Sequence, residues 1–252
     1  MDEICLTLWF LEKPTDVDSL YESFKNLSFF NPNEFYVNAD ESVKEKRIIK
    51  EEVELLFKKY YKLEPPLCIS LGNRNFRIDI TIPIQNNDCV FKFSNFECCV
   101  KMNLFRNNED YFELEKFFKQ MILLFKAKYG IVDSISNSSR VMRESNEDIY
   151  VPEKYVQNLF WGNFFGKGYV HNQHLMKVIN NHFIISEKVG DGYFVKLSDY
   201  VSGFSSEEVN YKRRKLRKDV KSITGYHYIR YDDNHNINQE GGSSNAGDGT
   251  VC

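Results

Sequence analysis

The sequence lacks the features that mark exported, membrane-spanning and zinc-finger proteins. Its first residues, MDEICLTLWFLEKP, have neither the basic flank nor the small-residue cleavage site of a signal peptide, so secretion is not predicted. No run of about 18 apolar residues occurs, which argues against a transmembrane helix and a membrane partner. The six cysteines form no C-x-x-C pair, and we expect free, mostly buried thiols in a reducing cytoplasm.

An excess of positive charge and any linker-like stretch are also missing. Lysine and arginine total 33 against 36 aspartates and glutamates, and the net charge of −3 argues against a surface built for nucleic acid. No stretch rich in Pro, Gly or Ser interrupts the first 230 residues. Residues 1–231 therefore predict a single domain with a candidate lobe division near 131–152, and residues 232–252 predict a mobile polar tail.

Catalytic motifs are absent as well. The glycine-rich segment WGNFFGKG at 161–168 contains Gly-Lys but no following Ser or Thr, so it does not match the Walker motif of a phosphate-binding loop. H-E-x-x-H and G-x-S-x-G do not occur. His171 and His174 share a helical spacing with His182 further on, but no cysteine or carboxylate cluster adjoins them, which favours ordinary polar positions. We predict no catalytic residue, no cofactor and no metal.

Local charge is clustered even though the total is balanced. Between Ser206 and Ile223 an apolar stripe alternates with basic residues, which predicts the solvated face of a docked helix and less readily a phosphate-binding surface. Acidic groups can meet a basic partner. The basic residues are Lys212, Arg213, Arg214, Lys215, Arg217, Lys218 and Lys221, and the acidic groups are Glu109, Asp110, Glu113 and Glu115, and Glu144, Glu147, Asp148 and Glu153.

Hydrophobic periodicity predicts an α+β fold. Period-two alternation indicates strands at 4–10, 76–82 and 96–104, with a turn at Gly72-Asn73. Helical spacing indicates helices at 16–27, 41–63 and 109–128, and further along at 169–179 and 206–223. Gly190-Asp191-Gly192 predicts a hairpin turn. We expect a largely antiparallel sheet covered by the first three helices, with a smaller C-terminal helix and hairpin region.

The aromatic and glycine-rich stretch W-G-N-F-F-G is the one candidate site. Its glycines are interpreted as tight turns where aromatic rings pack against backbone, and Trp161 as a mostly buried structural residue. The alternative is an aromatic contact patch for a partner. The residues are Trp161, Gly162, Asn163, Phe165 and Gly166.

From this stretch onward the sequence resembles the immunity proteins of bacterial polymorphic-toxin systems, particularly the immunity protein 52-like group. The resemblance covers residues 111–197 and lies in the order of elements: a long helix, a polar loop, the aromatic-glycine element, a short helix and a glycine-containing hairpin. It implies a cytoplasmic, non-enzymatic α+β protein that neutralises a cognate toxin domain by occluding its active site. Two alternatives remain open: a small-molecule or nucleic-acid binding enzyme that uses the 161–168 turn and the basic 212–221 helix, and a non-catalytic interaction or scaffold protein.

Overall fold

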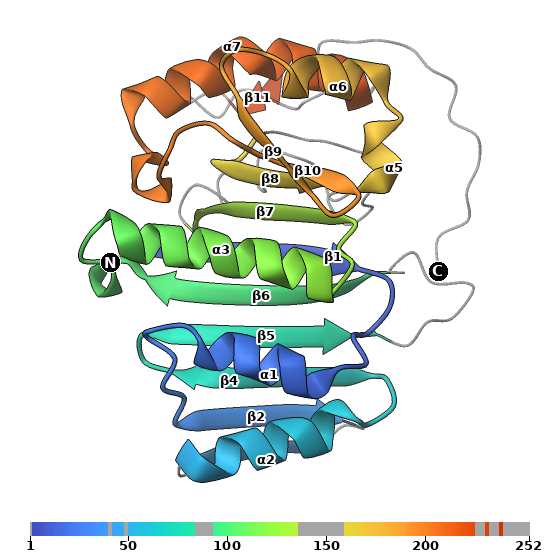
Figure 1. Ribbon diagram of the computed structural model, residues 1–252, viewed down its shortest axis with the longest axis vertical. Coiled ribbons are helices and arrows are strands. Elements are labelled where there is room, and N and C mark those ends of the chain that lie inside the picture. The colour runs from blue at the N-terminus through green and yellow to red at the C-terminus, as the bar shows by residue number, and fades with distance from the viewer. Residues whose placement is uncertain are drawn as a thin grey trace.

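The computed structural model describes residues 2–39, 42–47, 50–83, 93–135 and 159–224, together with 230–231 and 237–238. Ten strands of this part of the chain form one sheet in the order β3-β2-β4-β5-β6-β1-β7-β8-β10-β9 (Figure 1). Every neighbouring pair is antiparallel, which confirms the predicted fold class. The strands are β1 (Glu3–Phe10), β2 (Glu34–Ala39), β3 (Ser42–Arg47), β4 (Leu67–Asn73), β5 (Phe76–Ile82), β6 (Ser94–Lys101), β7 (Tyr129–Ser134), β8 (Gly162–Phe165), β9 (Ile185–Val189) and β10 (Gly192–Lys196).

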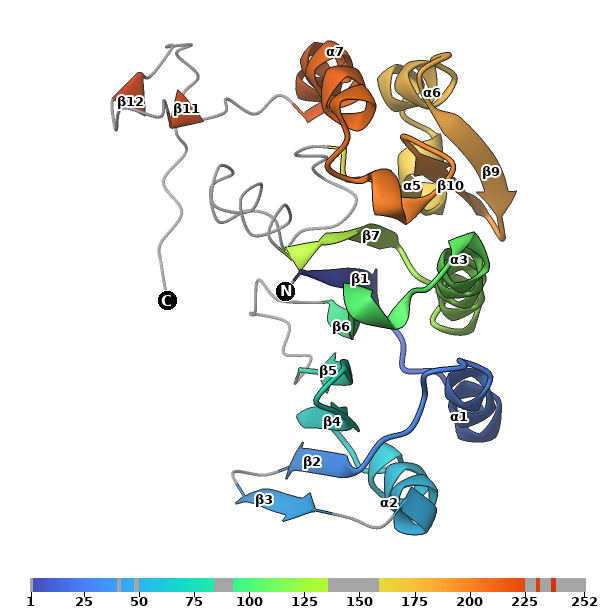
Figure 2. The same cartoon turned by 90° about the vertical axis from the view of Figure 1, so that its left-hand side faces the viewer.

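The helices lie on both faces of this sheet. Figure 2 shows the sheet close to edge-on, with α1 (Val17–Lys25), α2 (Lys50–Tyr61) and α3 (Asn108–Leu124) on one side. Near the β9 end lie α5 (Lys167–Val170), α6 (Gln173–Ile179) and α7 (Glu207–Thr224). Phe164 and Phe165 point to opposite faces because neighbouring strand residues alternate. Phe194 pairs with Phe164 on the neighbouring strand β10, so the two side chains share a face, and Phe194 packs on α3. Phe165 packs on α5. The helices α3 and α5 therefore cover opposite faces of the sheet.

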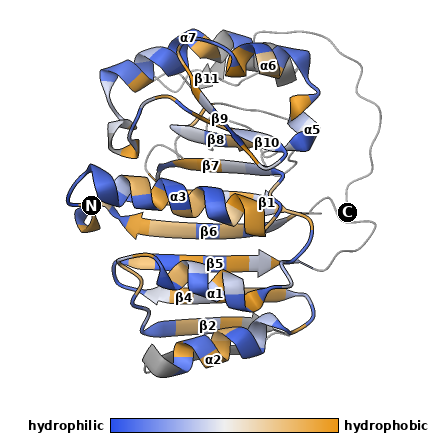
Figure 3. Ribbon diagram, in the orientation of Figure 1, coloured by the Kyte–Doolittle hydropathy of each residue, from blue (hydrophilic) through white to orange (hydrophobic). Residues whose placement is uncertain are grey.

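The main core lies between the first three helices and the sheet. The side chains of β1 that face these helices are fully buried, as are Phe96 of β6 and Phe24 of α1. The Phe24 ring stacks on Phe96 at 6.1 Å between centroids and meets Phe57 of α2 at 5.6 Å. Figure 3 shows the hydrophobic strand β6 beneath helices whose outward surfaces carry many hydrophilic residues. The predicted inward face of β5 is confirmed, since Phe76, Ile78 and Ile80 are buried.

Several predicted elements match the structure closely. Helix α3 begins one residue before its predicted start, and Asn107 and Asp110 form a capping box there. The predicted C-terminal hairpin is β9 and β10, joined by Gly190 and Asp191, with Gly190 in the left-handed region at φ 58°. It extends the same sheet. No helix in the described ranges combines the length and the apolar character that crossing a membrane requires.

Other element predictions are wrong. Residues 42–47, predicted as the start of a helix, form β3, because they pair along β2 at the sheet edge. The polar loop expected from 131 begins instead with β7, which runs between β1 and β8 and is buried on both faces. A strand buried on both faces shows no alternation and escapes a period-two search. Gly72 and Asn73 belong to β4, so the turn lies at Arg74 and Asn75.

Of three further predictions, one differs from the structure in detail and two fall mostly outside the described residues. The helix predicted at 169–179 is divided into α5 and α6. Most of the candidate lobe division at 131–152 lies outside the described residues, and so does most of the 232–252 tail. Within that tail only 237–238 is described, and it pairs with 230–231 as a short β-ladder.

Candidate functional site

The W-G-N-F-F-G stretch forms the interior strand β8 and the residues that lead into it. Gly162 is therefore in a strand, and its predicted role in a tight turn is wrong. The predicted packing of an aromatic ring against it is present: a Cβ there would lie 3.0 Å from the ring of Phe194. At Gly166 a Cβ would lie 2.7 Å from the carbonyl oxygen of Lys128, which explains the need for glycine. Because β8 is paired on both sides, Gly162 lies inside the sheet and belongs to no glycine-rich loop.

Trp161 is 1% exposed, so its predicted burial is confirmed. Its indole Nε1 donates to the hydroxyl of Ser198 at 2.7 Å, and its backbone N–H donates to Asp133 at 2.9 Å. Asn163 closes a local loop with Phe160, accepting from its backbone N–H and donating to its carbonyl. The motif is buried throughout, so its side chains offer little surface to a partner in this conformation.

A buried ion pair holds this region together. The carboxylate of Asp133 on β7 is fully buried and accepts from Nη2 of Arg213 on α7 at 2.6 Å. The same guanidinium donates to the carbonyls of Leu159 and Phe204. Arg213 was predicted to lie on a solvated basic face, and that prediction is wrong for this residue. Its charge fixes α7 to the sheet.

Of the remaining basic residues of α7, one is engaged in contacts within the molecule and two are exposed. Lys212 pairs with Glu208 at 2.6 Å and donates to the carbonyl of Leu197, whereas Arg214 and Lys215 are exposed as predicted. The side chains of Arg217, Lys218 and Lys221 lie outside the described residues.

The acidic residues of α3 are mostly engaged inside the molecule. Asp110 caps the helix, and Glu113 accepts from the backbone N–H of Ser28. Glu115 is buried and pairs with Lys119 at 2.8 Å and Lys196 at 2.9 Å. Only Glu109 of this group keeps an exposed side chain without a described partner. The second acidic group, Glu144, Glu147, Asp148 and Glu153, lies outside the described residues.

The outer surface of α3 has two exposed apolar side chains that sequence reasoning missed. Phe112 is 60% exposed and Leu123 is 55% exposed. With Lys116 and Gln120, they form a row at helical spacing, here called the α3 ridge. A cavity of about 570 Å³ lies between this ridge and α1, and a second of about 260 Å³ lies between the end of α3 and the β9–β10 turn. Leu123 lines both cavities.

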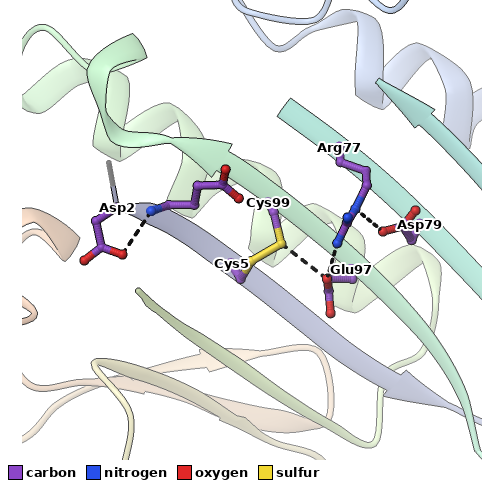
Figure 4. Close-up of a disulfide and its surroundings, with 7 residues drawn as sticks. Asp2, Cys5, Arg77, Asp79, Glu97 and Cys99 are labelled. Atoms are coloured by element: carbon purple, nitrogen blue, oxygen red, sulfur yellow. Dashed lines mark hydrogen bonds and ion pairs between the residues drawn. A yellow bond between two sulfur atoms is a disulfide. The ribbon is translucent and has the colours of Figure 1, made fainter. Parts of the chain in front are cut away.

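The outward face of β5 and β6 carries a charged group beside a disulfide (Figure 4). Arg77 lies between Asp79, at 2.6 Å from its Nε, and Glu97, at 3.3 Å from its Nη2. Burial, together with the charge of Asp79, raises the pKa of Glu97, and Arg77 opposes that shift. Cys5 and Cys99 are directly paired residues of β1 and β6 and form the disulfide.

The prediction of free thiols is therefore wrong for this cysteine pair. Cys68 and Cys98 are free, and burial raises the pKa of the Cys98 thiol. The other two cysteines, Cys89 and Cys252, lie outside the described residues. Cys5, Cys99 and Glu97 are the only described residues whose ligand atoms gather as a metal site would require. His171, His174 and His182 are exposed and do not belong to such a group.

No protein-family model matches the chain, and no curated protein matches it. Among solved structures, the fold is similar to that of the Pseudomonas aeruginosa T6SS protein PA0821, with a TM-score of 0.62. The similarity covers 96% of this chain and 77% of that chain, at 12% sequence identity. At this identity the comparison shows a shared fold.

Proposed function

We propose that this protein binds a toxin domain of a T6SS and neutralises it without chemistry of its own. The observation that carries the proposal is the fold, which matches a T6SS protein over almost the whole chain. The order of elements that resembles immunity proteins, from α3 through β8 to the β9–β10 hairpin, supports the same function. In this proposal the protein acts in the cytoplasm of the cell that makes the toxin or receives it.

The α3 ridge is the contact surface we propose for the toxin. Aromatic and large apolar side chains dominate the binding energy at protein interfaces, and Phe112 and Leu123 are more than half exposed. They are eleven residues apart, which places them about 16 Å apart along the helix axis. A typical interface buries about 800 Å² on each partner, so one ridge of this length can form its centre.

Charge along the ridge gives the contact a direction. Glu109 lies near Phe112, Lys126 lies near Leu123, and Lys116 lies between the two apolar side chains. All three are exposed, and none has an ion-pair partner among the described residues. A toxin surface with the opposite order of charges would dock in one orientation. Such complementarity accelerates association, which matters because a toxin acts until it is captured.

Co-expression tests the proposal. Cells that produce the cognate toxin domain should survive when this protein is present, and the two purified proteins should form a stable complex. Phe112→Ser and Leu123→Ser should each weaken the complex at least about 30-fold if these side chains are hot spots. Leu55→Ser is the matched control, because Leu55 is 70% exposed on α2, away from the ridge.

One result would count against the function, and another against the contact surface alone. If the protein gives no protection and forms no complex, neutralisation is wrong. If it protects but the ridge variants bind as tightly as Leu55→Ser, the function stands and the contact surface lies elsewhere.

A further inference from the structure

The disulfide lies within a group of three metal-ligand side chains on the outward face of the sheet. Cys5 and Cys99 are opposite each other on β1 and β6, with their Cα atoms 4.2 Å apart. Glu97 is two residues before Cys99, so its side chain leaves β6 on the same face. Its Oε1 lies 3.3 Å from Sγ of Cys99 (Figure 4). A disulfide sulfur has no proton to donate, so this contact does not compensate the charge of the carboxylate.

Reduction would convert this group into a donor set for a soft divalent cation. The two sulfur atoms and a carboxylate oxygen lie within 4.8 Å of one another. Zinc binds thiolate sulfur at about 2.3 Å and carboxylate oxygen at about 2.0–2.2 Å, in tetrahedral geometry. These bond lengths place two thiolate ligands about 3.8 Å apart, a separation that side-chain rotation can supply once the disulfide is broken. We propose that the reduced chain binds one Zn²⁺ through Cys5, Cys99 and Glu97, with water as the fourth ligand.

The chemistry is a two-electron reduction followed by metal binding. A dithiol reductant gives two electrons and two protons to the Cys5–Cys99 disulfide, whose S–S bond breaks while a disulfide forms in the reductant. Zinc then binds the two thiolates, and their two protons pass to solvent. The site therefore exists only in the reduced chain, since disulfide sulfurs are poor zinc ligands.

The neighbouring charges suit a cation. With both thiols ionised, the cluster has the two thiolates, Glu97 and Asp79 against Arg77, a net charge of about −3 by formal counting. One Zn²⁺ lowers this to about −1 by the same counting. Arg77 donates to Glu97 at 3.3 Å and would hold the carboxylate in place, as groups outside the ligand set do in known metal sites.

The test measures zinc binding in a chain from which the cysteines outside the cluster are removed, apart from one. Cys68→Ser, Cys89→Ser and Cys252→Ser together remove the cysteines outside the cluster, except the buried Cys98. This background is reduced, freed of reductant, mixed with ZnCl₂ and dialysed, and its metal content is measured by mass spectrometry. We expect one zinc per chain after reduction and no stoichiometric zinc after oxidation.

Two variants of this background separate ligation from folding. Cys99→Ser should abolish stoichiometric zinc binding, and Glu97→Gln, which keeps both thiols, should weaken it about 10- to 100-fold in competition with a chromophoric chelator. Circular dichroism checks that each variant is folded. Co²⁺ in place of zinc should give a thiolate charge-transfer absorption with the intensity of two sulfur ligands. The proposal is overturned if the reduced background binds no more zinc than its folded Cys99→Ser variant, or if Glu97→Gln leaves the affinity unchanged.

Discussion

Replacing Arg213 by methionine tests how strongly the buried ion pair holds α7 on the sheet. The substitution keeps an unbranched side chain but removes the cation that faces Asp133 at 2.6 Å. Asp133, with no solvent exposure, would keep only two of its described donors, the backbone N–H groups of Ser134 and Trp161. Breaking a buried pair from one side costs about 3–5 kcal/mol, because the remaining charge loses its counter-ion.

The expected effect is large enough to measure by melting. For a chain of this size, about 3–5 kcal/mol lowers Tm by roughly 6–20 °C. Asp133→Asn should also destabilise the protein, because it removes the carboxylate that pairs with the buried guanidinium. The double variant removes both charges. Its loss of free energy of unfolding should therefore be about 2 kcal/mol smaller than the sum of the losses of the two single variants.

Urea unfolding followed by circular dichroism gives the free energies of unfolding for this cycle. Arg214→Met is the matched control, because Arg214 is exposed on the next position of α7, and its effect should stay within about 0.5 kcal/mol. The reasoning fails if Arg213→Met melts like the control, or if the two single losses add without coupling.

Three further predictions follow from single side chains. Trp161→Ala should cost about 3–5 kcal/mol in urea unfolding, because a buried indole is removed; a variant that melts normally yet loses its partner would refute the structural role. Tyr61→Phe should raise the free energy of unfolding by about 1 kcal/mol, because the buried hydroxyl of Tyr61 has no hydrogen-bond partner within the described part of the chain; a lower free energy of unfolding would show that the hydroxyl has a partner. Burial raises the pKa of Tyr21 from 10.0 to about 12, so folding favours the protonated phenol. The stability that Tyr21 contributes should therefore be complete below about pH 10 and be lost as the pH rises towards about 12. Over that range the urea midpoint of Tyr21→Phe should fall less than that of the unmodified protein. Parallel pH profiles of the two proteins would contradict this.

The sequence by itself determined the elements whose signals are local. Alternation over β1 and β5, the capped start of α3 and the glycine turn between β9 and β10 each depend on residues within a few positions of one another. Such contacts form in whatever fold the chain adopts. They were enough to predict the fold class, because helices with one apolar stripe must cover a sheet with an apolar face.

The tertiary structure decided which strands are neighbours and which side chains meet. β7 is buried on both faces only because β1 and β8 flank it in a sheet that is covered on both sides there. β3 is a strand because it pairs with the edge of β2. Cys5 meets Cys99 across 94 residues, and Asp133 meets Arg213 across 80. Sheet register sets the first contact, and the docking of α7 on the sheet sets the second. Both depend on the packing of the whole chain, so no local pattern contains them.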